Sequence, residues 1–326
     1  MTDKKLYLTR AQLISELGRC LGCKSKPCMN ACPVNCNPQE FIAKAKANDF
    51  AGAVETITRN NPMGQTCGLI CPDKFCMQAC TRAGIDFPIN IPRVQATILE
   101  KYRTAESAAH PKLPANGKKV AVIGAGPAGI AATAELSRLG YRITLFESFE
   151  KIGGALNLIP DKRLPFEVIA KDWSFIDDPD MIELRLNTPV NNPAALLEQD
   201  FDGVIVATGE PEGINLGIDG EEHAVSYLDY LRHPEHYAAR GNIAVIGGGA
   251  VATDCALTAV NNGAENVEMF VRRRVSDMRV TGEERKSLLD AGVDLTTMTK
   301  IKKIGADGDY LTLYTAKNRF NRGKLE

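Results

Sequence analysis

Two cysteine-rich segments decide the fold: CLGCKSKPCMNACP at residues 20–33 and CGLICPDKFCMQAC at residues 67–80. Together they hold eight of the ten cysteines in the chain. A [4Fe–4S] cluster takes four ligands, normally thiolates, and closely spaced cysteines let one loop supply several of them. A proline directly follows Cys32 and Cys71 and turns the backbone away from each thiol. Two blocks of four cysteines therefore predict two [4Fe–4S] clusters.

Zinc and disulfides are the alternative uses of these cysteines. Zinc sites usually pair two C-x-x-C knuckles or add histidine, whereas residues 20–80 contain one C-x-x-C and no histidine. Disulfides would require an oxidising compartment. The N-terminal residues MTDKK are not followed by the apolar core of a signal peptide. We therefore favour iron–sulfur clusters and expect a cytoplasmic protein.

Length, composition and charge narrow the class of protein. The 326 residues are enough for two or three domains, and an apolar content of 44% is ordinary for a globular protein. A net charge of −1 provides no basic field for nucleic acid or anionic lipid. The apolar run over residues 120–136 is interrupted by glycines, a proline and Glu135, so it does not predict a membrane span. Neither nucleic acid nor a membrane is an expected partner.

The N-terminal third has the apolar periodicity of helices. Helices are predicted over residues 8–19, 38–58 and 93–102. Asn48-Asp49 and Gly52 predict a break that divides the second of these into two helices. Residues 104–117 contain two prolines and small polar residues, which is typical of a linker. This part of the chain should thus form a small helical domain built around the cysteines.

A dinucleotide-binding pattern begins at residue 119. An apolar strand over residues 119–123 precedes GAGPAG, and a helix to Leu139 leads to a strand over residues 142–146 that ends on Glu147. Glycines allow the tight turn and the close approach of a pyrophosphate, and the acid is placed to bond ribose hydroxyls. The paired glycines that follow, and the small residues after a strand near residue 206, could also pass close to a cofactor. The candidate contacts are Gly124, Gly126, Pro127, Ala128, Gly129, Glu147, Gly153, Gly154, Ala207, Thr208 and Gly209.

The same pattern recurs over residues 242–274. A strand, the turn GGGAVA, a helix to Asn261 and a strand over residues 267–271 follow one another, but this unit ends on three arginines instead of an acid. Arginines at that place accommodate a 2′-phosphate, whereas an acid suits an unphosphorylated ribose. A solvated basic turn is the alternative. Beyond this unit, residues 299–304 and 310–315 should form a hairpin.

The motifs, taken in this order, resemble the N-terminal electron-transfer portion of dihydropyrimidine dehydrogenase and the small subunit of glutamate synthase. The resemblance covers about residues 10–315, and its most specific parts are the two cysteine blocks and PINIPRVQ at residues 88–95. The last segment favours the dihydropyrimidine dehydrogenase type, in which a glutamine replaces one cysteine ligand. That glutamine would be Gln95.

The resemblance implies ligand sets that cross the two cysteine blocks, whereas spacing alone favours one block for each cluster. One cluster would take Cys20, Cys23, Cys28 and Cys80. The other would take Cys32, Cys71, Cys76 and Gln95. Cys36 and Cys67 would then have no ligand role.

The resemblance also implies the nucleotides: FAD bound by the pattern that begins at residue 119, and NADPH rather than NADH bound by the pattern over residues 242–274. The residues implied for NADPH are Gly247, Gly248, Gly249, Ala250, Arg272, Arg273 and Arg279. The expected fold class is α/β, with an N-terminal α-helical [4Fe–4S] domain and two Rossmann-like domains. The expected boundaries are 1–103 for the iron–sulfur domain, 104–117 for the linker, 118–240 for the FAD domain and 241–326 for the NADPH domain. The family's return segment to the FAD domain has no counterpart here, so the last domain is expected to be incomplete.

The expected function is that of an NAD(P)H-dependent oxidoreductase. The chain would be an electron-transfer flavoprotein subunit that passes electrons between NADPH, FAD and two [4Fe–4S] clusters, to or from a catalytic partner in a hetero-oligomer. Because the cofactors carry this chemistry, no residue is nominated as a general acid or base. The alternative is an iron–sulfur and FAD scaffold, or electron conduit, that does not itself oxidise NADPH.

Overall fold

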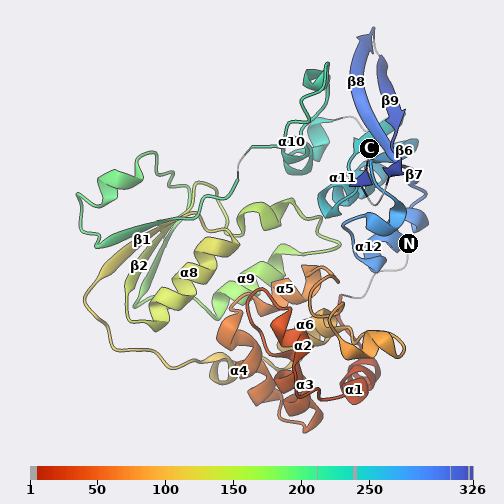
Figure 1. Ribbon diagram of the computed structural model, residues 1–326. Coiled ribbons are helices and arrows are strands. Elements are labelled where there is room, and N and C mark those ends of the chain that lie inside the picture. The colour runs from red at the N-terminus through yellow and green to blue at the C-terminus, as the bar shows by residue number, and fades with distance from the viewer. Residues whose placement is uncertain (1–5, 211, 238–240, 309, 322–323, 326) are drawn as a thin grey trace. The chain divides into compact units, whose positions relative to one another are not determined.

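The computed structural model describes residues 6–210, 212–237, 241–308, 310–321 and 324–325 (Figure 1). The chain divides into two compact units. The first unit comprises Met1–Asn157 and Asp161–Gly209, and the second comprises Leu158–Pro160 and Glu210–Glu326.

The first unit begins with a helical domain around the cysteines. Its helices are α1 (Arg10–Arg19), α2 (Pro27–Asn30), α3 (Pro38–Lys46), α4 (Phe50–Asn60), α5 (Gly64–Ile70), η1 (Thr81–Gly84), α6 (Ile91–Tyr102) and α7 (Ala105–Ala108). Thr9, Asn37, Asp49 and Asn90 cap the N-termini of α1, α3, α4 and α6 with their side chains. The apolar core of this domain includes Phe41, with α4 and α6 packed against each other.

The predicted break between α3 and α4 is confirmed, and the structure locates it at Asn48. This residue has a φ of +64°, which ends α3. Gly52 is not part of the break, because it lies in the first turn of α4 and donates its N–H to Asp49 Oδ1 at 2.8 Å. The prediction that Gly52 helps to mark the break was therefore wrong, because Gly52 belongs to the capped first turn of α4.

A four-stranded parallel sheet forms the second part of the first unit. Its elements are β1 (Lys119–Ile123), α8 (Pro127–Arg138), β2 (Arg142–Phe146), η2 (Gly154–Leu158), α9 (Phe166–Ser174), β3 (Ile182–Arg185), η3 (Pro193–Leu196) and β4 (Gly203–Val206). The strand order is β3-β2-β1-β4, and α8 packs on β1 and β2 (Figure 1). Ile123 is level with Phe146 in β2 and with Val206 in β4. The residues that follow these three strands therefore meet at one edge of the sheet.

The second unit contains a smaller parallel sheet and a hairpin. Its elements are η4 (Glu221–His223), α10 (Tyr227–Arg232), η5 (Pro234–His236), β5 (Asn242–Ile246), α11 (Ala250–Asn261), β6 (Asn266–Val271), η6 (Val275–Asp277), α12 (Gly282–Asp290), β7 (Asp294–Thr297), β8 (Thr299–Asp307), β9 (Tyr310–Lys317), β10 (Phe320–Asn321) and β11 (Lys324–Leu325). The parallel sheet has the order β5-β6-β7, and β8 pairs antiparallel with β9 as predicted. Met269, on β6, is fully buried in the core under α11 and α12.

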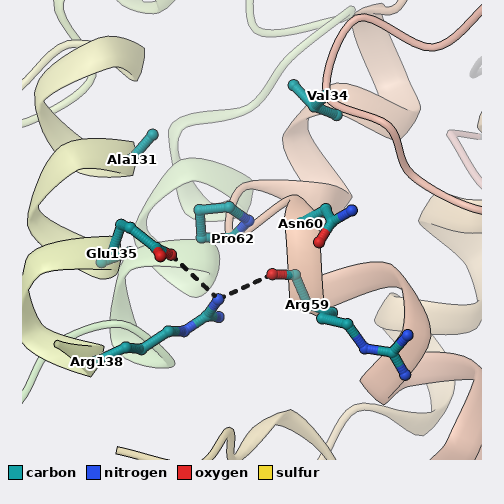
Figure 2. Close-up of a pocket in the computed structure, with 8 residues that line it drawn as sticks. Val34, Arg59, Asn60, Pro62, Ala131, Glu135 and Arg138 are labelled. Atoms are coloured by element: carbon teal, nitrogen blue, oxygen red, sulfur yellow. Dashed lines mark hydrogen bonds and ion pairs between the residues drawn. The ribbon is translucent and has the colours of Figure 1, made fainter. Parts of the chain in front are cut away.

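A joint within the first unit links the helical domain to the sheet (Figure 2). Arg138, at the end of α8, donates to the carbonyls of Thr58 at 3.0 Å and Arg59 at 2.9 Å, where α4 ends. The hollow beside it measures about 330 Å³. Both arginines that line the hollow already have partners: Arg138 binds the two carbonyls, and the Arg59 guanidinium binds Glu55 at 2.7 Å. We therefore interpret the joint as a cap for the carbonyls of α4.

Candidate cluster and nucleotide sites

The first group of thiols joins the two cysteine blocks. One cavity is lined by Cys20, Cys23, Cys28 and Cys80. Cys20 follows α1, Cys23 and Cys28 flank the start of α2, and Cys80 directly precedes η1. Burial raises the pKa of the Cys28 thiol, and the nearby Cys80 and Cys20 thiols raise it further. Four thiols around one cavity are the donor set that a [4Fe–4S] cluster requires.

The second group of thiols consists of Cys32, Cys67, Cys71 and Cys76, of which Cys67 lies in α5. Burial raises the pKa of Cys76 to about 12, and the Cys32 thiol is the next cause. Cys71 ends α5, and its hydrogen bond with Cys67, together with burial, raises the pKa of the Cys67 thiol. With their pKa raised in this way, the Cys67 and Cys76 thiols are neutral at pH 7 while they hold no metal. Binding of iron would therefore release protons from them.

Gln95 on α6 contributes an amide to this second group. The side chain is buried, and Nε2 donates to the carbonyl oxygen of Gly64 at 2.7 Å. This bond fixes the amide plane, and Oε1 lies 3.8 Å from Cys36 Sγ. An amide oxygen held in this way can serve as a ligand.

The glycine turn after β1 is closely packed on one side and open on the other. Gly124 has a φ of +100°, and a Cβ there would lie 2.4 Å from the carbonyl oxygen of Ala207. A Cβ on Gly129 would lie 1.8 Å from the carbonyl oxygen of Gly124. A Cβ on Gly126, by contrast, would meet only the Cα of Gly154, at 3.9 Å. The turn thus leaves space beside Gly126, at the point where a pyrophosphate would approach the start of α8.

Three separate predicted segments converge at this turn. Gly153 donates its N–H to the carbonyl of Ala125 at 2.8 Å, and Gly154 passes beside Gly126. Ala207 follows β4 at the same edge of the sheet. Pro127 and Ala128 open α8, while Thr208 and Gly209 continue from Ala207. The structure therefore brings the first glycine turn, Gly153-Gly154 and Ala207-Thr208 together, and Gly209 follows them in the chain.

Glu147 has an internal role that the sequence did not reveal. The carboxylate is buried; Oε2 accepts from the N–H of Ala125 at 2.8 Å, and Oε1 accepts from the N–H of Phe149 at 3.0 Å. The Ser148 hydroxyl donates to Oε1 as well, at 3.1 Å. A carboxylate offers about four acceptor sites. Glu147 therefore holds the glycine turn in place, and a ribose would share oxygens that already accept hydrogen bonds.

The second glycine turn follows β5. Gly247 has a φ of +146°, and a Cβ on Gly248 would lie 2.5 Å from Val271 Cγ1. Nothing lies within 4 Å of the position of a Cβ on Gly249, so this side of the turn and the start of α11 at Ala250 are open. Arg279 donates its N–H to the carbonyl of Gly248 at 3.0 Å. The backbone of a predicted arginine is thus bonded directly to the turn.

The three arginines after β6 differ in their surroundings. The guanidinium of Arg274 binds Asp277 at 2.7 Å. For Arg272 and Arg273, the bonds within the described part of the chain are made by the backbone carbonyls. Asn318 Nδ2 donates to the carbonyl of Arg272 at 2.8 Å, and the N–H of Met298 donates to the carbonyl of Arg273 at 3.0 Å. The structure therefore fixes the backbone of Arg272 and Arg273 and leaves their guanidinium groups available to an anion.

A histidine pair in the second unit, His233 and His236, lies beside the carboxylate of Glu235, which also stands between the two histidines in the sequence. Glu235 Oε1 lies 3.5 Å from His233 Nδ1 and 3.7 Å from His236 Nε2. All three residues are exposed. The arrangement is that of a solvated surface turn.

No helix in the described residues has the length and apolar character needed to span a membrane.

Fold and site together define an NAD(P)H-dependent oxidoreductase with iron–sulfur and flavin-type nucleotide-binding domains. Residues 1–107 match the family described as dihydropyrimidine dehydrogenase domain II, 4Fe-4S cluster. Residues 122–173 match the NAD(P)-binding Rossmann-like domain, and residues 178–322 match pyridine nucleotide-disulphide oxidoreductase. The chain belongs to the family of the PreT subunits of NAD-dependent dihydropyrimidine dehydrogenase. The PreT subunit of Escherichia coli K12 is 34% identical to it over 293 residues, which cover 86% of this chain and 70% of that protein.

Other similar proteins agree with this assignment. The PreT subunit of Salmonella typhimurium LT2 is 35% identical over 86% of this chain and 70% of its own length. Among solved structures, 2-naphthoyl-CoA reductase has a TM-score of 0.54 at 21% identity and covers 78% of this chain. Histamine dehydrogenase from Rhizobium sp. 4-9 has a TM-score of 0.52 at 16% identity and covers 90%. The chain spans 38% and 45% of those two chains, and they share its fold.

Proposed function

We propose that this protein is the electron-transfer subunit of a larger redox enzyme. It would pass electrons between NADPH, FAD and two [4Fe–4S] clusters, to or from a catalytic partner subunit. The observation that carries the proposal is the cavity lined by Cys20, Cys23, Cys28 and Cys80, which draws thiols from both cysteine blocks. When bound, the flavin links the two-electron chemistry of the nicotinamide to the one-electron chemistry of the clusters.

The helix that ends at Cys71 packs against the flavin-type sheet domain within the first unit. Cys71 ends α5, and α5 packs on α9 of that domain. Asp172 on α9 accepts the N–H of Thr66 at 2.8 Å. The helix that delivers a proposed cluster ligand is thereby held by the domain proposed to bind FAD. This supports transfer between the two sites within one unit.

The proposed partner is a dihydropyrimidine dehydrogenase subunit, because the relatives are named as subunits of that enzyme. Purification of the native complex should yield a hetero-oligomer, and mass spectrometry would identify the second chain.

Addition of NADPH to the anaerobic protein should bleach the flavin spectrum. A flavin that stays oxidised with both NADPH and NADH would support the scaffold or conduit role instead.

Loss of a proposed ligand should remove one cluster. The protein purified anaerobically should contain about eight iron atoms, since each of two clusters holds four. Cys71→Ser should reduce this to about four, because the thiolate at the end of α5 is lost. Iron and acid-labile sulfide analysis measures both values.

Two controls accompany this experiment. Cys36→Ser and Cys255→Ser each remove another buried thiol, and both should leave the iron content unchanged. A wild-type content near four iron atoms would contradict the proposal of two clusters.

The coenzyme preference should depend on the two arginines with available guanidinium groups. A charge-assisted hydrogen bond contributes about 1.5–3 kcal/mol, or roughly ten- to a hundredfold in affinity. In Arg272→Ala/Arg273→Ala, the ratio of kcat/KM for NADPH over NADH should therefore fall at least about tenfold. Steady-state kinetics with both coenzymes measures this ratio.

The matched control is Arg274→Ala, because Arg274 is engaged by Asp277 and its loss should leave the ratio unchanged. The relatives are named NAD-dependent. A wild-type protein that prefers NADH would overturn the NADPH assignment, and equal losses for both coenzymes would reduce the arginines to a role in the fold.

A further inference from the structure

Cys36 is a buried thiol to which neither proposed ligand set gives a role. It lies between α2 and α3, and its exposed fraction is 2%. Asn35, with a φ of +53°, turns the backbone just before it. The left-handed turn and the following cap at Asn37 fix the direction of Cys36. The thiol is thus held in the interior by local structure on both sides.

The thiol and the amide of Gln95 converge from two different elements. Cys36 Sγ lies 3.8 Å from Gln95 Oε1. The bond from Nε2 to Gly64 prevents that amide from turning away. The thiols of Cys32, Cys67 and Cys28 are close enough to act on Cys36 electrostatically, and Cys32 has the largest effect of the three. Cys36 therefore lies next to the oxygen proposed as the ligand from Gln95 and near Cys32 and Cys67 of the second group of thiols.

As ligands, the thiolate of Cys36 and the amide oxygen of Gln95 differ in charge and in softness. A thiolate is anionic and soft, and it is the usual ligand of iron in these clusters. An amide oxygen is neutral and hard. A buried cysteine can also be a small apolar residue of the core, but that role does not require an amide oxygen beside the thiol.

We propose that Cys36 and Gln95 share the fourth coordination position of the second cluster, so that a thiolate or an amide oxygen can hold it. The inference rests on the second cluster of the proposed function. When Sγ takes the position, an iron–sulfur bond replaces the iron–oxygen bond and the thiol proton passes to solvent. No electrons are gained or lost in this exchange. The Cys36-bound cluster carries one more negative charge, which lowers its reduction potential.

The test compares Cys36→Ala, Gln95→Leu and the double variant in the full-length, anaerobically purified protein. Each single variant should keep the wild-type content of iron and sulfide, since the other group holds the position. The double variant should lose about half of both, because one of two clusters then lacks a ligand. Cys36→Ala should also raise the midpoint potential of one cluster and change its EPR spectrum, while Cys255→Ala should do neither.

Two results would overturn the inference. One is a Cys36→Ala protein whose EPR spectrum and midpoint potentials match the wild type. The other is loss of half the iron in Gln95→Leu alone, which would make Gln95 the sole ligand while leaving the proposed function intact. If the double variant does not fold, the spectra of Cys36→Ala decide the question. A wild-type protein with iron for only one cluster would contradict the proposed function itself, before any variant is compared.

Discussion

Gly126→Val should purify as a folded protein without its flavin. Gly126 has a φ of −76° and a ψ of −178°, a backbone conformation open to valine. A Cβ there would meet only the Cα of Gly154, at 3.9 Å. The fold should therefore tolerate the side chain, which would occupy the space that the pyrophosphate needs. The flavin absorbance of the purified protein, relative to protein concentration, should fall to background, and circular dichroism should match the wild type.

Gly249→Val is the matched control for this variant. Gly249 also has open space at the position of a Cβ, but in the second glycine turn. That variant should keep its flavin and lose the binding of the nicotinamide coenzyme. Full occupancy of FAD in Gly126→Val would show that the first turn has only a structural role.

Asp172→Ala should cause the largest loss of stability among single changes proposed here. The side chains of Asp172 and Arg103 are both fully buried, and Arg103 Nη1 lies 2.6 Å from Asp172 Oδ1. The N–H groups of Gln65 and Thr66 also donate to this carboxylate. Removal of one partner from a buried ion pair leaves an uncompensated charge, which costs about 3–5 kcal/mol. Denaturant unfolding of the first unit, followed by circular dichroism, measures this loss.

Two further variants test the explanation. Asp161→Ala, at an exposed position, should change the free energy of unfolding by less than about 0.5 kcal/mol. Replacement of both partners, in Arg103→Met/Asp172→Leu, should destabilise less than Asp172→Ala, because no charge is left buried alone. A double variant less stable than Asp172→Ala would show that the carboxylate acts mainly by capping α5.

Local sequence patterns predicted the strands and glycine turns well. The expected bounds of β1, β2 and β5 agree with the structure, because each is a short apolar run that ends at a turn residue or an acid. The hairpin of β8 and β9 turns near Gly308 as expected. Parallel pairing then places Gly124, Glu147 and Ala207 at one edge of the sheet. The strands, the glycine turns and the hairpin depend on residues near one another in the chain, whereas the parallel pairing joins distant segments.

One missed helix had a local signal. No element is predicted from the apolar pattern over residues 282–290, where the structure has α12. Thr281 and Glu284 form a capping box at its start, a pattern that is visible in the sequence. The apolar periodicity of this helix is weak, since Leu288 is its one buried residue, so the pattern does not predict a helix there.

Helix α5 had no such signal, and the tertiary structure alone determines its start. Its N-cap residue, Met63, makes no capping hydrogen bond with its side chain. The free N–H groups of Gln65 and Thr66 are instead accepted by Asp172, a residue of α9 more than one hundred positions later in the chain. A helix whose cap comes from a distant element cannot be recognised from its own sequence.

The cysteine groups likewise combine features that the local sequence determines with features that only the packed fold determines. Spacing and turn chemistry are local, so they reveal the clustered thiols and the two glycine turns without the fold. Spacing does not show that Cys80 shares a cavity with Cys20, Cys23 and Cys28, a grouping that only the family resemblance implied, nor that Cys36 lies beside Gln95; the tertiary structure shows both. Such contacts arise when the helices between the two blocks pack and close long loops of the chain. The free energy of that packing comes from the buried core of the whole domain, which the spacing within one block does not encode.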